Sequence, residues 1–171
     1  MNGNGIQQSG QVTPGHLASW MTEGVLEDGG ALLASQKVLA AIAQANFNST
    51  FDQPLILPPA ITAFQLTGLI VTNASVSLTT AAGGFYTAAS KGGSAIVASS
   101  QAYSSLTTAN LLLNATLTAF AQTARFSANN LGSILGSNNQ YGLAIYLSLT
   151  TAQGVVATAD VYAIGIDLSN P

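Results

Sequence analysis

Residues 141–168 read YGLAIYLSLTTAQGVVATADVYAIGIDL, and this stretch decides the fold class. Two runs rich in Val, Ile, Leu, Thr and Tyr, 142–150 and 155–168, have the composition of β-strands. Residues 151–154 lie between them, and Gly154 is able to adopt the left-handed backbone conformation of a tight turn. The stretch therefore predicts two strands joined as a hairpin.

The second of these strands has no strongly polar face. With strict alternation, one face carries Val156, Thr158, Asp160, Tyr162, Ile164, Ile166 and Leu168. The other face carries Val155, Ala157, Ala159, Val161, Ala163 and Gly165. We therefore expect both faces to be covered, one by the second sheet of a sandwich and the other by a neighbouring subunit.

Further strands are expected upstream, in segments of similar composition that Gly and Asn interrupt. They lie near 64–72, 75–79, 84–88, 94–103, 110–118 and 123–127. About eight short strands with turn residues between them predict a mainly β fold. We expect its body, residues 60–171, to be a β-sandwich of jelly-roll-like form.

A short α-helix is predicted over residues 31–47, ALLASQKVLAAIAQANF, because Ala and Leu are strong helix formers. Leu32, Leu39 and Ile42 fall near one face at helical spacing. This face fits either an oligomerisation helix or a helix packed on its own domain. The Pro-containing loop 48–59 follows and places the domain boundary between residues 59 and 60.

Residues 1–30 are rich in Gly and predict an extended arm. Four apolar side chains, Leu17, Trp20, Val25 and Leu26, stand among its turn residues. Large aromatic side chains are favoured anchors at protein interfaces. We therefore expect the arm to anchor the chain to a partner.

The content of charged residues is the most unusual feature of the composition. Only 5% of the 171 residues are charged, whereas 48% are hydrophobic. Ordinary soluble domains have roughly 25% charged residues, and the centres of protein interfaces are depleted of charge. The composition predicts a homo-oligomer, with a trimer as the first choice.

Several kinds of partner and location are disfavoured. No run of 18 apolar residues exists, which argues against a membrane-spanning segment. The three basic residues do not cluster, which argues against nucleic-acid binding. The first residues, MNGNG, lack the features of a signal peptide, so we expect synthesis in a cytoplasm.

The residues offer no catalytic constellation, and the chain is expected not to be an enzyme. His16 is the only histidine, and no Cys is present to complete a metal site with it. The acidic cluster Glu23, Glu27 and Asp28 is too small to hold Ca²⁺ by itself. Asp160 and Asp167 fall on opposite faces of the last strand. We predict no catalytic residues, cofactor or metal.

Some aromatic residues have the chemistry to stack on sugar rings, namely Phe85, Tyr86, Tyr103, Tyr141 and Tyr146. They are also ordinary strand residues, and strand preference favours packing in the core or at an interface. Tyr141, beside the loop 136–142, is the best candidate for an exposed aromatic platform.

Two stretches near the start carry a resemblance to a known group. They read SGQVTPGHLASW at 9–20 and GVLEDGGA at 24–31. This pattern resembles a short module of phage and prophage structural proteins. Similar small phage proteins share body segments like VTNAS at 71–75, LTTAAGGFY at 78–86, SKGG at 90–93 and LSLTTAQG at 147–154.

The resemblance implies a virion protein made in the cytoplasm of a bacterial host. A capsid decoration (cement) protein or short head fibre, docked through its arm on the major capsid protein, is the first expectation. The alternative is a tail-fibre or adhesin component that binds a host surface glycan. The small, acidic chain lacks a long fibrous repeat, which favours decoration.

Overall fold

The computed structural model describes residues 7–8, 16–20, 25–31 and 35–169. The chain divides into two compact units, residues 1–35 and 36–171. The second unit, called the body below, therefore begins at residue 36, and the boundary predicted after residue 59 is wrong. The reason is that residues 36–46 pair with the last strand of the body.

The N-terminal unit contains the short extended pieces expected of the arm. They are the strands β1 (Gln7–Gln8), β2 (His16–Trp20) and β3 (Val25–Ala31). β3 lies between the other two, parallel to β1 and antiparallel to β2.

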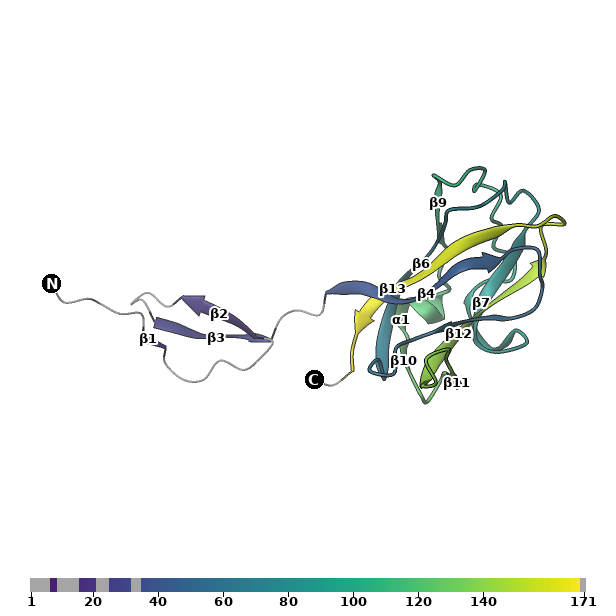
Figure 1. Cartoon of the computed structure of the whole chain (residues 1–171). Helices are drawn as coiled ribbons and strands as arrows, with labels where there is room; N and C mark the ends of the chain where they lie inside the picture. Colours follow the sequence, from purple (N-terminus) through teal and green to yellow (C-terminus); the bar gives the residue numbers. More distant parts are fainter. Residues whose placement is uncertain (1–6, 9–15, 21–24, 32–34, 170–171) are drawn as a thin grey trace. The chain divides into compact units, whose positions relative to one another are not determined.

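The body is mainly β and consists of two five-stranded antiparallel sheets, as a β-sandwich requires (Figure 1). The first sheet contains β4 (Gln36–Asn46), β6 (Ala63–Thr72), β9 (Leu112–Ala115), β10 (Arg125–Ser127) and β13 (Thr158–Asp167). The second contains β5 (Gln53–Ile56), β7 (Ala82–Ala88), β8 (Gly92–Val97), β11 (Ser133–Leu135) and β12 (Tyr141–Thr151). The predicted fold class is confirmed, although residues 75–79 form no strand.

The strands β12 and β13 do not form the predicted hairpin. β12 pairs with β5, β7 and β11, whereas β13 pairs with β4 and β6 in the other sheet. The turn glycine itself is confirmed, because Gly154 has a φ of 86°. The connecting loop crosses between the sheets and is bonded to the residue after β4: the Gln153 N–H donates to the Phe47 carbonyl at 2.8 Å.

The helix predicted over 31–47 is wrong, because residues 36–46 form strand β4. Helix propensity is a weak local preference, and the pairing of β4 along β13 overrides it. Leu39 is buried in the core at 1% exposure, and Ile42 packs against the core. Gly165 makes room for Leu39, because a Cβ at Gly165 would lie 2.6 Å from Leu39 Cδ1. Leu32 lies outside the described residues.

The described part of the chain contains one short helix, α1 (Ala119–Thr123), which lies between β9 and β10. Thr118 caps its start, since the Thr118 hydroxyl accepts a hydrogen bond from the Ala121 N–H at 3.3 Å. A short helix is therefore present, but at a different place from the one predicted.

Aromatic pairs hold the interior of the body together. Phe47 meets Tyr103 edge to face with 4.9 Å between ring centroids, and Phe64 stacks on Phe126 at 5.2 Å. The buried Tyr103 hydroxyl donates to the Gly83 carbonyl at 3.2 Å, and burial raises the pKa of this phenol above its usual value. The contacts of Tyr103 join the loops 47–52 and 98–111 to each other and to β7.

Candidate interaction surfaces

Three loops at one end of the body expose large apolar side chains. They present Phe51, Val76, Val155 and Val156, and we call this set the apolar end. Phe51 is 83% and Val156 is 84% exposed. The loops follow β4, β6 and β12, so the apolar end lies at the opposite end of β4 from Gln36, where the body begins.

Hydrogen bonds tie these three loops to one another. The Gly154 N–H donates to Asn48 Oδ1 at 2.9 Å, and the Thr80 hydroxyl donates to the Gln153 carbonyl at 2.7 Å. The Ser75 N–H donates to the Thr158 carbonyl at 2.8 Å. The exposed side chains therefore lie on loops that hydrogen bonds hold in place, so the apolar end is a preformed surface.

The apolar end is not predicted by the sequence pattern. Val155 and Val156 were assigned to the last strand, which in fact begins at Thr158. Phe51 lies in the predicted loop 48–59, where its neighbours at 48–50 and 52–53 are all polar. A large apolar residue in such a loop was the available signal.

The outer face of the first sheet forms a second apolar surface. Inward-facing Ala159, Val161 and Ala163 of β13 are buried, as one face of a sandwich strand requires. On the other face Tyr162 and Ile164 are half-buried, and their neighbours in the sheet register are Ile70 on β6 and Val38 on β4. Within one copy of the chain, one face of β13 is thus covered and the other is partly open.

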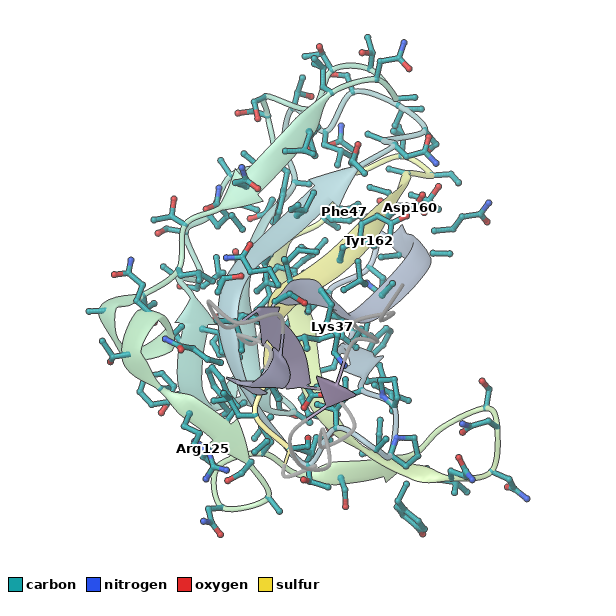
Figure 2. The ribbon with its side chains drawn as sticks, turned by 90° about the vertical axis from the view of Figure 1, so that its left-hand side faces the viewer. Lys37, Phe47, Arg125, Asp160 and Tyr162 are labelled. Carbon is teal, nitrogen blue, oxygen red and sulfur yellow. The ribbon has the colours of Figure 1, made fainter. Side chains whose placement is uncertain are left out.

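Asp160 lies at one end of this outer face. Its carboxylate accepts hydrogen bonds from the Gln44 N–H at 2.8 Å and from Asn73 Nδ2 at 2.9 Å. Figure 2 shows Asp160 and Tyr162 towards the same end of the body as Phe47, with Lys37 farther along. Lys37 Nζ binds the Asp167 carboxylate at 2.7 Å.

These two aspartates occupy opposite ends of β13 and bind different partners. The fold therefore does not bring Asp160 and Asp167 together. Among the described residues, no three His, Cys, Asp or Glu side chains gather in one place. The described helix α1, five residues long, is too short to cross a membrane.

The predicted arm anchors fall on two paired strands. Leu17 and Trp20 lie in β2, Val25 and Leu26 lie in β3, and Trp20 is opposite Leu26 in the register. His16 is opposite Ala31. Glu27 and Asp28 belong to β3, whereas Glu23 lies outside the described residues.

The aromatic residues divide as strand preference predicts, with one exception. Phe85, Tyr86 and Tyr103 are buried in the body, and Tyr146 is half-buried. Tyr141, at the start of β12, is 67% exposed. It is the aromatic platform candidate that the structure leaves open to solvent.

Comparison with models of known protein families, with curated proteins and with solved structures found no match to this chain.

Proposed function

We propose that this chain is a structural protein of a bacteriophage particle, either a capsid decoration protein or a short head fibre. The observation that carries the proposal is the surface of the body. Three of the nine charged residues, Glu23, Glu27 and Asp28, precede residue 36, which leaves six charged residues in the whole body. The same body exposes ten large hydrophobic side chains.

Such a surface suits assembly with other proteins. Burying a charged group without a partner is costly, whereas Ser, Thr and small apolar groups lose little on leaving water. Of the six charged residues, Lys37 and Asp167 already bind each other. The apolar end and the outer face of the first sheet are the surfaces we assign to contacts between copies, with a trimer as the first choice.

The N-terminal unit is the proposed anchor on the major capsid protein or another virion protein. It is one of the two compact units of the chain, which fits a docking module. Leu17, Trp20, Val25 and Leu26 are the anchor residues in this proposal. The resemblance of residues 9–31 to a phage module supports the same role.

The number of copies in purified virions tests the proposal. Quantitative mass spectrometry should find hundreds of copies per particle, since decoration and head-fibre proteins follow the symmetry of the shell. A handful of copies would instead place the chain in the tail. Absence from purified virions would rule out a structural role.

The alternative is a tail-fibre or adhesin component that binds a glycan on the host surface. One observation favours it, the exposure of Tyr141 at the start of β12. Copy number distinguishes the two roles, and sugar binding by the body is a separate question.

A further inference from the structure

We infer that the β11–β12 hairpin and the segment 58–62 form a binding site for a neutral oligosaccharide. The inference does not depend on the proposed structural role; it rests on the alternative, glycan-binding function and names the site and the class of ligand. It rests on the shape of two hollows, the chemistry of their lining and the exposure of one aromatic ring.

Two hollows adjoin at Pro59, which lines both of them. The larger has a volume of about 400 Å³ and extends along the loop between β11 and β12. The smaller has a volume of about 220 Å³ and lies against Tyr141. The larger hollow by itself falls within the size range of small-molecule sites, about 300–1,000 Å³. We call the two hollows together the hairpin groove.

The lining of the hairpin groove is uncharged throughout its described residues. It offers side-chain amides and hydroxyls, namely those of Asn138, Gln140, Ser137, Ser133 and Thr62. Amides and hydroxyls both donate and accept hydrogen bonds, as sugar hydroxyls also do. A charged ligand would find no counter-charge in this lining, so the groove favours a neutral polyol.

Tyr141 supplies the apolar platform that a sugar ring needs. One face of a pyranose carries C–H groups, and such a face packs on an aromatic ring, while the phenol remains available for a hydrogen bond. Tyr141 lines the smaller hollow. In the register of the hairpin it is opposite Leu135, which is also exposed.

The groove is preformed by backbone contacts. The Gly136 N–H donates to the Gln140 carbonyl at 2.8 Å, and the Asn139 N–H donates to the Gly136 carbonyl at 3.0 Å. Asn139 takes a left-handed conformation with φ of 62°, which Asn tolerates better than most residues. These bonds fix the loop that carries the amides of Asn138 and Gln140.

Gly142 lines the smaller hollow. The Leu57 N–H donates to the Leu143 carbonyl at 2.8 Å, and this approach leaves no space at Gly142. A Cβ there would lie 2.1 Å from the Leu57 carbonyl oxygen. The glycine therefore allows the segment after β5 to close against β12, which shapes both hollows.

The test uses the purified full-length chain on an array of neutral oligosaccharides built from glucose, galactose, mannose and rhamnose, with sialylated and sulfated glycans as the charged comparison. We expect binding to at least one neutral glycan and none to the charged ones. The affinity is then measured by titration in solution for that glycan.

Three variants locate the site. Tyr141→Ala should weaken binding by at least about tenfold, the equivalent of one aromatic contact. Tyr141→Phe should keep most of the affinity, because the ring face remains. Phe51→Ala, which removes a still more exposed aromatic ring at the apolar end, should leave the affinity unchanged.

Tyr141 is mostly exposed, so its replacement leaves the core intact and the melting temperature should not change. The inference is overturned if no neutral glycan binds at millimolar concentration, or if only charged glycans bind. It is also overturned if Tyr141→Ala binds as tightly as the unmodified chain. None of these results bears on the number of copies in virions.

Discussion

Lys37 Nζ lies 2.7 Å from the Asp167 carboxylate, so an ion pair joins the first strand of the body to the last. The bond from Lys37, with a second from Ser169, lowers the pKa of Asp167 from its usual 3.8 to about 2. Because the two residues are 130 positions apart, the pair links neighbouring strands that come from opposite ends of the body sequence.

The first prediction concerns acid stability. A carboxylate whose pKa is lowered by folding stabilises the folded state above its unfolded pKa, and that contribution is lost as the carboxylate is protonated. For Asp167 the loss should occur as the pH falls from about 4 to about 2. Asp167→Asn should reduce the slope of unfolding free energy against pH in this window, measured by urea titration.

At neutral pH the same substitution should have a small effect. Lys37 is 48% exposed, so water and salt screen the pair, and its loss should cost at most about 1 kcal/mol. Lys37→Met is the matched control. In the Asp167→Asn background it should cause little further loss of unfolding free energy. A full additional loss in the double variant would show that the pair is not coupled.

The second prediction tests strand β4 through two adjacent residues. Leu39→Ala should destabilise the body by about 2–5 kcal/mol, because it leaves a cavity in the core. Val38→Ala, at a side chain that is 55% exposed, should change the unfolding free energy by less than about 0.5 kcal/mol. Similar costs at both positions would contradict the burial pattern of β4.

The third prediction concerns the contact between β7 and β8. A Cβ at Gly84 would lie 2.3 Å from the Val97 carbonyl oxygen, so Gly84→Ala forces the backbone apart. We expect a loss of about 1–3 kcal/mol in chemical denaturation. Gly68→Ala on β6 is the control, since the space around its Cβ is open. An unchanged Gly84→Ala variant would show that these strands separate freely.

The fourth prediction separates the two units. Deletion of residues 2–35 should leave a folded body whose melting temperature changes by less than about 2 °C, as expected for a change well below 1 kcal/mol. The body should no longer join particles, and Trp20→Ala in the full chain should reduce incorporation. An unfolded body contradicts the division into units, and undiminished incorporation contradicts the anchor.

The fifth prediction concerns association between copies. The chain should form a multimer at micromolar concentration in sedimentation velocity, and the combined substitution Phe51→Ser and Val156→Ser should lower its mass. Removing two exposed apolar side chains weakens a contact made by the apolar end without touching the core. Leu135→Ser, an exposed position on the β11–β12 hairpin, is the control. Identical masses for all three proteins would exclude the apolar end as an interface.

The mainly β character of the body follows from the sequence alone. Segments rich in Val, Ile, Leu, Thr and Tyr become β6, β7, β12 and β13, close to their predicted bounds. Gly154 takes the left-handed conformation that its position in a turn requires. These features depend on the preferences of neighbouring residues, and such preferences can be read without knowing the fold.

Only the tertiary structure decided that residues 36–46 form a strand and to which sheet each strand belongs. It also decided where the apolar end and the hairpin groove form. Ala and Leu favour a helix locally, yet β4 gains more by pairing with β13 and burying Leu39 above Gly165. The apolar end and the hairpin groove each join segments far apart in the sequence. Contacts of this kind depend on how the sheets pack, so the pattern of neighbouring residues in the sequence does not predict them.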